Sequence, residues 1–180
     1  PGGGTFPEVT REINTTVGTG TLAISYIGHG GGAGWADERI LETKHIDDWK
    51  NTNNLPLFLT ATCEFSRFDN PGTLSAGEHV ILNPTGGGIA LLTTVRLVFG
   101  GESNNIGFSK LFFKHNIVPD GARYNTFGDA VRLTKTESSI GTQFNNRKFA
   151  LIGDPAVRLA VPKYNVTTTN VQNELGLTVD

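Results

Sequence analysis

Two residues that together could perform nucleophilic catalysis stand directly after two apolar segments of the chain. His29 follows the run 21–27, and Cys63, the single cysteine among 180 residues, follows the run 55–62. A thiol attacks a carbonyl carbon as its thiolate, and a nearby imidazole can take the thiol proton and then hold the thiolate as an ion pair. His29 and Cys63 are therefore candidates for the general base and the nucleophile of an acyl-transfer reaction.

Glycines surround the histidine, because residues 28–32 read GHGGG. Acyl transfer needs hydrogen-bond donors for the oxyanion that forms on the carbonyl oxygen. A glycine leaves its backbone N–H open to a substrate, since no side chain covers it. We expect the backbone amides of Gly30 and Cys63 to be these donors.

Other interpretations of the same residues are possible. A histidine on a glycine-rich turn and a lone cysteine are each more often structural than catalytic, and residues 28–33 also match the G-x-G-x-x-A dinucleotide loop and the lipase oxyanion motif. A dinucleotide loop should open a helix at once, but Gly34 and Trp35 intervene, and the acids near the expected spacing, Asp47 and Asp48, lie in a predicted helix. A lipase needs G-x-S-x-G, which this chain lacks. The coincidence of both residues at strand ends favours the catalytic pair.

The elements that must position this pair alternate along the chain. Apolar and β-branched runs predict strands at 21–27, 55–62, 89–98 and 149–152. Helices are expected at 9–17, 38–51, 75–82, 106–115 and 126–137. This alternation indicates an α/β fold, with parallel strands and helices on both faces of an open sheet.

Ligands of such sheets bind beyond the carboxyl ends of the strands, where His29 and Cys63 stand. Neighbouring strands lie about 5 Å apart, so two side chains at adjacent strand ends can reach each other. We therefore expect the imidazole and the thiol to face one cleft. We also expect the strand 89–98 to line the cleft wall beside the strand that ends at Cys63, with Arg96 close to the cysteine.

Composition excludes several other classes of protein. A net charge of −2 gives no positive field to attract a phosphate backbone, so we expect no nucleic acid as partner. The longest apolar run, 88–99, is interrupted by polar residues and is too short to span a bilayer, so we expect no transmembrane segment in this chain. A single cysteine allows neither an intrachain disulfide nor a multi-cysteine zinc site. We expect no metal and no cofactor, and we interpret the remaining histidines as surface groups: His45, His79 and His115.

The boundaries of the chain suggest an excised piece. It begins at Pro1 and contains no methionine, so any targeting signal is expected to lie outside it. Residues 1–162 are expected to form one domain. The β-rich composition of 163–180 indicates the truncated start of a following domain.

Several longer motifs resemble the gingipain family of cysteine peptidases. They are YIGHG at 26–30, LFLTATCEFSRFDNP at 57–71, GEHVILNP at 77–84, GGGIALLTTVR at 86–96 and LIGDP at 151–155. The likeness extends over residues 18–162. It implies a caspase-like fold, an open and mostly parallel sheet flanked by helices on both faces, with His29 and Cys63 as the catalytic pair.

Within that family the likeness is greatest to the sortases of type IX secretion. It implies that the carboxy-terminal sorting domain of secreted cargo is cut off through a thioester at Cys63. The cargo then passes to a surface lipopolysaccharide, with other secretion-system subunits as further partners and an exported, outer-membrane-associated location. The alternatives are a plain cysteine endopeptidase and a non-catalytic module that docks cargo.

The resemblance leaves two roles open. The family's earlier subdomain supplies an acid partner for the histidine, and nothing here matches it, although Glu38, Glu64 or Glu78 could approach the site. Arginine specificity is not carried over, because no matching pocket acid is present. Substrate contacts are expected from Glu64, Thr94 and Arg96.

Overall fold

A computed structural model of the chain describes residues 4–99, 102–121, 123–137 and 145–161. The predicted β-rich segment 163–180 lies outside the described residues, so its assignment stays a prediction. The elements, in chain order, are α1 (Pro7–Thr19), β1 (Ala23–Ile27), β2 (Gly30–Gly31), β3 (Gly34–Trp35), β4 (Leu41–Glu42), α2 (Thr43–Asp47), β5 (Leu57–Ala61), α3 (Ala76–Leu82), β6 (Ala90–Thr94), α4 (Glu102–Ile117), α5 (Phe127–Glu137), a short 3-10 turn (Asn146–Lys148) and β7 (Phe149–Gly153).

The main sheet has the strand order β1-β5-β6-β7. β1 pairs in parallel with β5, and β5 pairs in parallel with β6, as the alternation of strands and helices predicted. β7 runs antiparallel to β6. The reason is that two helices, α4 and α5, separate these strands. The chain therefore crosses the length of the sheet twice and starts β7 at the edge where β6 ends. The mostly parallel α/β class is confirmed.

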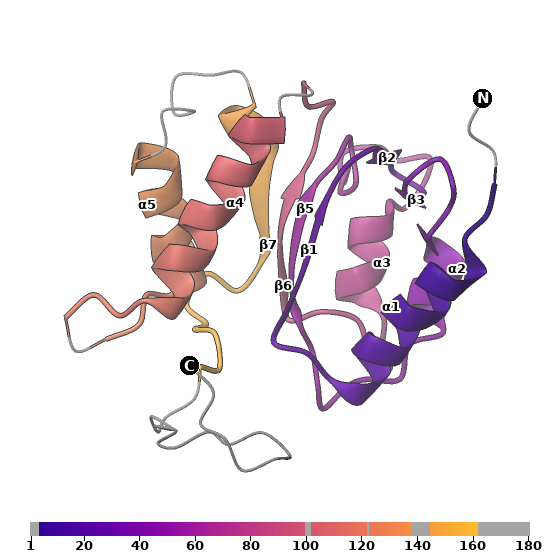
Figure 1. The fold of residues 1–180 in the computed structure, drawn as a ribbon, viewed down its shortest axis with the longest axis horizontal. Helices are drawn as coiled ribbons and strands as arrows, with labels where there is room; N and C mark the ends of the chain where they lie inside the picture. Colours follow the sequence, from indigo (N-terminus) through magenta and orange to yellow (C-terminus); the bar gives the residue numbers. More distant parts are fainter. Residues whose placement is uncertain (1–3, 100–101, 122, 138–144, 162–180) are drawn as a thin grey trace, which may run out of the picture.

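Helices cover both faces of this sheet (Figure 1). Alternate residues of the central strand β5 point to opposite faces, because side chains in a strand alternate with a period of two. Leu57 and Leu59 pack with Phe108 and Phe112 of α4, while Phe58 packs in a second cluster under α1, α2 and α3. The sheet is thus the middle layer of three, with a separate hydrophobic core on each side.

Local sequence signals fix the ends of the helix that follows β5. Glu78 accepts a hydrogen bond of 2.8 Å from the backbone N–H of Ser75, and the Ser75 side chain caps α3 in return. This reciprocal capping box satisfies amides that a helix start leaves unpaired. Asn83 and Pro84 end the helix, since the residue before a proline is disfavoured in helical geometry.

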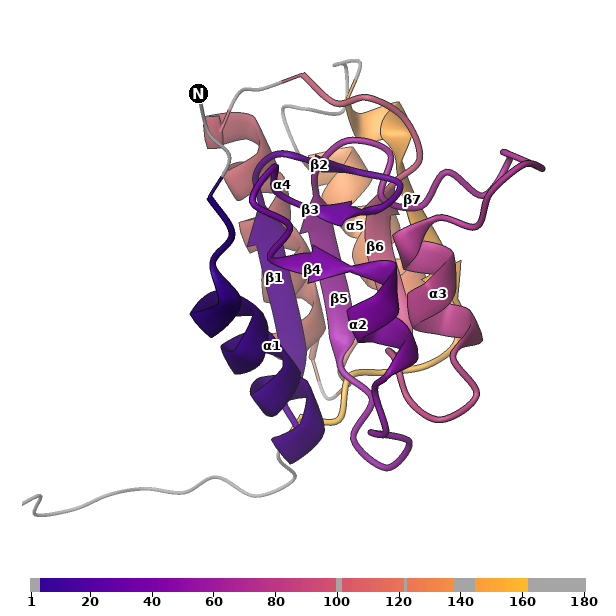
Figure 2. The same cartoon turned by 90° about the vertical axis from the view of Figure 1, so that its right-hand side faces the viewer.

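The segment 38–51 differs from the predicted helix. It forms strand β4 and the five-residue helix α2 instead. Ala36 and Arg39 take positive φ angles of 61° and 56°, which turn the chain back so that β4 pairs with β3. The resulting small sheet, β2-β3-β4, lies over the same face as α1 to α3 (Figure 2). The strand predicted at 89–98 is also shorter, and β6 ends at Thr94.

None of the described helices combines the length and the apolar character that crossing a membrane requires.

Buried hydroxyl groups tie β5 and β6 to the loop after Cys63. The Thr60 hydroxyl donates to Thr93 Oγ1 at 2.8 Å, and Thr93 Oγ1 lies 2.9 Å from Ser66 Oγ. All three side chains are buried. Because buried polar groups need partners, Thr93 is the shared partner that makes this arrangement stable.

We predict that Thr93→Val lowers the free energy of unfolding by about 1–3 kcal/mol, because two buried hydroxyls then lose a partner while the side-chain shape is kept. Urea denaturation measures the change. Thr136→Val, which alters an exposed threonine bonded only within its own helix, is the control and should change stability by less than about 0.5 kcal/mol. Equal losses in the two variants would contradict the role of Thr93.

Candidate active site

The pairing of β1 with β5 places His29 and Cys63 at equivalent positions. Ala23 lies opposite Leu57, and the same register continues to Ile27 opposite Ala61. His29 and Cys63 each follow their strand by two residues, so they stand side by side beyond the carboxyl edge of the sheet. Both line one cavity of about 450 Å³. The expectation that they face a common cleft is therefore met.

The cysteine thiol is oriented by the neighbouring wall of this cavity. Cys63 is half-buried, and its Sγ donates to the Val98 carbonyl oxygen at 3.7 Å. His29 is exposed, and no hydrogen bond joins the two side chains directly, although both lie in the described part of the chain. Catalytic hydrogen bonds are often long in the absence of substrate and tighten when it binds. The pair is thus open to a ligand from the His29 side.

Two hydrogen bonds fix the backbone at His29. Its carbonyl oxygen accepts from the Tyr26 hydroxyl at 2.7 Å and from the Ala36 N–H at 2.8 Å. The Tyr26 ring stacks on the ring of Trp35, with centroids 4.6 Å apart. A Cβ at Gly28 would lie 2.8 Å from the Tyr26 hydroxyl, so a larger residue there would displace this hydroxyl. Tyr26 therefore positions the loop that carries His29.

Close packing also explains the glycine after the histidine. A Cβ at Gly30 would lie 2.6 Å from Thr62 Oγ1 and 2.6 Å from the Gly34 carbonyl oxygen. The absence of a side chain at Gly30 lets the His29 loop lie directly against the residue that precedes Cys63. The dinucleotide interpretation is wrong, because the glycines lead into β2 and β3 and not into a helix. The backbone amides of Gly30 and Cys63 as oxyanion donors stay a prediction.

The start of α3 connects the two loops. The Ala76 N–H donates to the Gly32 carbonyl oxygen at 2.7 Å, and the Gly77 N–H donates to the Phe65 carbonyl oxygen at 2.8 Å. The first amides of a helix have no partner within the helix. Here those amides bind one carbonyl from the His29 loop and one from the Cys63 loop, so a single helix end holds both loops in place.

The residues predicted to contact substrate have other contacts. Glu64, Thr94 and Arg96 are not among the described residues that line the His29/Cys63 cavity. The Thr94 hydroxyl is fully buried and donates to the Thr62 carbonyl oxygen, and the Arg96 guanidinium pairs with Asp69 on the surface. The Glu64 carboxylate forms an ion pair with Arg67, with Oε1 3.4 Å from Arg67 Nη1.

These contacts fasten the loop after β5 to the end of β6. The Glu64 N–H donates to the Arg96 carbonyl oxygen at 3.4 Å, and the Ser66 N–H donates to the Thr94 carbonyl oxygen at 3.0 Å. Thr94 and Arg96 therefore support the cysteine loop. The expected closeness of the segment 89–98 to the Cys63 loop is confirmed for its backbone. The Arg96 side chain, however, extends away from Cys63 and pairs with Asp69.

The acid partner of His29 is not identified among the described residues. Glu78 is engaged in the capping box of α3, Glu64 is paired with Arg67, and Glu38 acts on Tyr26, whose pKa its charge helps to raise. No described carboxylate forms a hydrogen bond with the His29 ring.

The other three histidines have structural partners and are half-buried, which corrects their interpretation as plain surface groups. His79 Nδ1 lies 2.6 Å from Asp47 Oδ1, and His115 Nε2 lies 2.6 Å from Glu137 Oε2. His45 Nδ1 accepts from a backbone N–H as part of the cap of α2.

Sequence reasoning missed Tyr26 and Phe99, whereas the expectation that the segment 89–98 lines the cleft wall is confirmed at Val98. Tyr26 lies within the motif at 26–30, but nothing in the sequence shows that its hydroxyl reaches back to His29. Phe99 is held by Asn145, which is 46 positions away. A contact over that distance leaves no local pattern.

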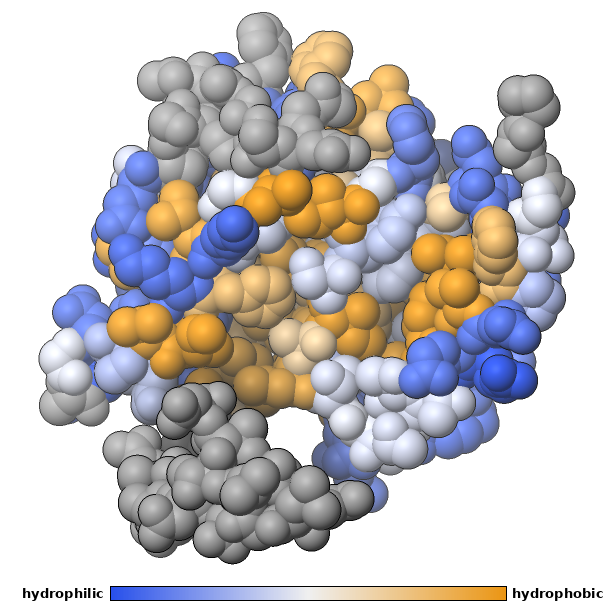
Figure 3. Space-filling model, viewed as in Figure 1, coloured by the Kyte–Doolittle hydropathy of each residue, from blue (hydrophilic) through white to orange (hydrophobic). Residues whose placement is uncertain are grey.

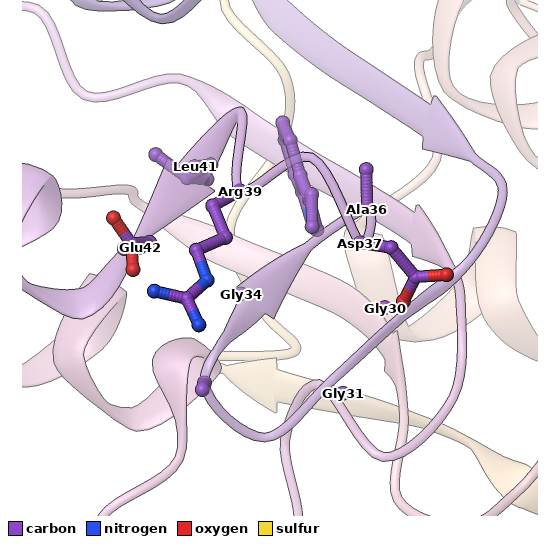
Figure 4. A pocket seen from close by; sticks show the side chains of 10 residues that line it. Gly30, Gly31, Gly34, Ala36, Asp37, Arg39, Leu41 and Glu42 are labelled. Carbon is purple, nitrogen blue, oxygen red and sulfur yellow. The ribbon is translucent and has the colours of Figure 1, made fainter. Parts of the chain in front are cut away.

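A second cavity, of about 620 Å³, is lined in part by the next residues of the glycine segment, Gly30 and Gly31. Charged side chains from the β3–β4 connection and from β4 line it (Figure 4). Arg39 and Glu42 lie on one side of Gly34, and Asp37 lies on the other. The two cavities beside the His29 loop therefore differ in chemistry, because this one is polar.

Comparison with known proteins identifies the class. The fold matches the crystal structure of the Arg-specific cysteine proteinase gingipain R (RgpB) with a TM-score of 0.69 and 16% sequence identity, over 88% of this chain and 37% of that one. The complex of the Porphyromonas gingivalis RgpB pro- and mature domains gives 0.68 and 16%, over 88% and 38%. A structure described only as a protease gives 0.66 and 19%, over 89% and 41%. The fold is thus the caspase-like fold of the gingipains.

The family follows from the sequence itself. Residues 1–160 match the model of Peptidase family C25, and the chain belongs to that family. The resemblance to gingipains is confirmed at this level. No curated protein sequence matches the chain significantly. The chain spans about two fifths of the length of the solved structures that it resembles.

We predict that Tyr26→Phe lowers the free energy of unfolding at pH 7 by about 1 kcal/mol, the net value of a neutral hydrogen bond. Burial, assisted by the charge of Glu38, raises the pKa of Tyr26 above its ordinary value of 10.0. The folded state therefore favours the protonated phenol, and the contribution is complete below pH 10.0 and is lost as the pH rises through the raised pKa. The stability difference between wild type and Tyr26→Phe should thus shrink at high pH.

Urea denaturation between pH 7 and pH 11 measures this difference. Tyr124→Phe leaves the His29 contact in place and serves as the control, so it should not reproduce the effect. A pH-independent difference for Tyr26→Phe would contradict the assignment of the bond to the phenol hydroxyl.

Proposed function

We propose that this chain forms the part of a cysteine peptidase that carries the catalytic pair, with Cys63 as nucleophile and His29 as general base. The observation that carries the proposal is that the two residues line one cavity at in-register strand ends. Membership of Peptidase family C25 supports it. The fold alone would be compatible with many activities, so the site and the family are both needed.

In the proposed reaction, the Cys63 thiol leaves the Val98 carbonyl and passes its proton to the His29 ring. The thiolate attacks the carbonyl carbon of a peptide bond, and the backbone amides of Gly30 and Cys63 donate to the resulting oxyanion. The C–N bond then breaks, and the leaving amine takes the proton from His29. Cys63 now holds the acyl group as a thioester.

The second half of the reaction decides the type of enzyme. Water, deprotonated by His29, attacks the thioester in a hydrolase and releases a carboxylic acid. An amine attacks in a transpeptidase and forms a new amide bond. Cys63 regains its proton in both cases, so the same two residues serve both outcomes.

The finer proposal is a transpeptidase similar to PorU, the sortase of type IX secretion. Its substrates would be the carboxy-terminal sorting domains of secreted cargo, its acceptor a surface lipopolysaccharide, and its location the outer surface of the cell. The sequence motifs at 26–30, 57–71 and 77–84 support this choice. One alternative is a plain cysteine endopeptidase, which would form the same thioester and release it with water. The other is a non-catalytic module that binds cargo and forms no thioester.

Trapping the acyl-enzyme separates these alternatives. The full-length protein is mixed with a mass-tagged acyl donor, and the adduct on Cys63 is located by peptide mass spectrometry. Release of the tag by water alone indicates a hydrolase, and faster release with formation of an amide when an amine is added indicates a transpeptidase. A donor that never labels Cys63 would favour the docking module.

We predict that Cys63→Ala and His29→Ala each lower the rate of cargo cleavage by at least about 10³-fold, because the members of a catalytic unit act together. The double variant should be little slower than either single one, whereas two independent binding residues would have additive effects. His79→Ala, which alters a histidine on α3 that is paired with Asp47, is the matched control. Thermal unfolding confirms that each variant is folded.

Near-normal cleavage by Cys63→Ala would show that the catalytic assignment is wrong. Additive losses in the double variant would show that the two residues do not act as one unit.

A further inference from the structure

The residue before the nucleophile, Thr62, points away from the cavity of the catalytic pair. Leu57, Leu59 and Ala61 pack in the core on the α4 side of the sheet, the side on which Figure 3 shows hydrophobic side chains gathered. Ala61 and Cys63 line the cavity. Because side chains alternate between the two faces of a strand, Thr62 faces the other side, where the sheet β2-β3-β4 lies.

The Thr62 side chain packs directly against the residue that follows His29. Thr62 is fully buried, and a Cβ built on Gly30 would lie 2.6 Å from Thr62 Oγ1. The Gly34 carbonyl oxygen would be equally close to that Cβ. The backbone of Gly30 is not in the left-handed region, so the need for a glycine there comes from space and not from conformation. The Thr62 hydroxyl therefore lies against the backbone of Gly30.

Hydrogen bonding does not account for the hydroxyl at position 62. Thr62 Oγ1 is buried and has no partner among the described residues, whereas the nearby hydroxyls of Thr60 and Thr94 donate to Thr93 Oγ1 and to the Thr62 carbonyl oxygen. Burying a hydroxyl without a partner costs stability. The oxygen is, however, smaller than a methyl group. It therefore lets Gly30 approach more closely than the methyl group of a valine would.

The main chain on both sides of this contact is fixed. The Thr94 hydroxyl binds the Thr62 carbonyl oxygen, and the Gly28 N–H donates to the Ala61 carbonyl oxygen at 3.3 Å. Closely packed interiors transmit strain because they have little room to absorb it. A larger group at position 62 should therefore displace Gly30 and the amide that it carries.

We propose that Thr62 is a positioning residue for acyl transfer, because its hydroxyl sets the height at which the Gly30 and Cys63 N–H groups reach the same oxyanion. The inference rests on the proposed function, since it needs acyl transfer to Cys63 and these two donors. It deepens that function by naming the residue that sets their spacing. Oxyanion donors act at about 2.7–3.1 Å, so a small displacement of one donor weakens the interaction.

The experiment measures the acylation of Cys63 in the full-length protein by the mass-tagged acyl donor, over a range of donor concentrations. For Thr62→Val we expect the maximum rate to fall at least about 10-fold, and the half-saturating concentration to change less than about 3-fold, because the oxyanion forms only on the way to the thioester. Thr62→Ser keeps the oxygen. It should retain a maximum rate within about 3-fold of the wild type.

Alkylation of Cys63 by iodoacetamide separates positioning of the donors from damage to the thiol. The sulfur displaces iodide, so a C–S bond forms as the C–I bond breaks and no charge develops on a carbonyl oxygen. The rate depends on the thiolate and its access, so Thr62→Val should react within about 3-fold of the wild type. Thr134→Val changes a buried threonine of α5 that donates to the Ala130 carbonyl oxygen. It is the matched control and should leave both rates unchanged.

Each outcome decides between the two proposals. Normal acylation in folded Thr62→Val, equal losses of acylation and alkylation, or an equal loss in Thr62→Ser would overturn the role of Thr62 and leave the proposed function standing. If Thr62→Val does not fold, Thr62→Ala replaces it. Thr62→Ala removes the support beneath Gly30 and should slow acylation but not alkylation, so normal acylation in that variant would also overturn the role. If wild-type Cys63 is alkylated but never acylated, by this donor or by a cargo domain, the proposed function fails and the inference fails with it.

Discussion

The site depends on the register between β1 and β5. Each residue of β1 lies opposite the residue 34 positions later in β5, from Ala23 and Leu57 to Ile27 and Ala61. Continued for two residues, this register brings His29 and Cys63 to the same height above the sheet. A slip of one residue would turn every side chain of a strand to the opposite face, so burial of alternate residues on both faces holds the pair in place.

Beyond the ends of the strands, hydrogen bonds to the backbone hold the two loops that carry His29 and Cys63. Two amides at the start of α3 bind one carbonyl from each loop, and the Tyr26 hydroxyl binds the carbonyl of His29 itself. Glycines at positions 28 and 30 allow these approaches because a side chain there would meet Tyr26 or Thr62. Reactive groups must be held closely by a surrounding shell to be effective, and here that shell consists mostly of backbone hydrogen bonds.

The His29 loop contributes to two cavities of different character, because residues 28 and 29 line one of them and residues 30 and 31 line the other. The larger has charged side chains from β4 and the turn before it, and the smaller, at Cys63, has hydrocarbon walls. Val98 contributes to the smaller cavity in two ways. Its carbonyl oxygen accepts the hydrogen bond of the Cys63 thiol, and Val98 also forms part of the lining. The resting position of the nucleophile and the shape of the cavity are therefore set by the same short segment after β6.

Sequence alone determined the α/β class, nearly all the helices and main-sheet strands, and the candidate pair, because hydrophobic periodicity and strand-end glycines are local signals. It failed at 38–51, where positive φ angles at Ala36 and Arg39 turn an apparent helix into β4 and α2. The direction of β7 and the contacts of Thr94, Arg96 and Tyr26 were decided only by the tertiary structure. Those features depend on which distant segments meet, as Asn145 meets Phe99, and packing of the whole chain selects such contacts without leaving a pattern in either segment.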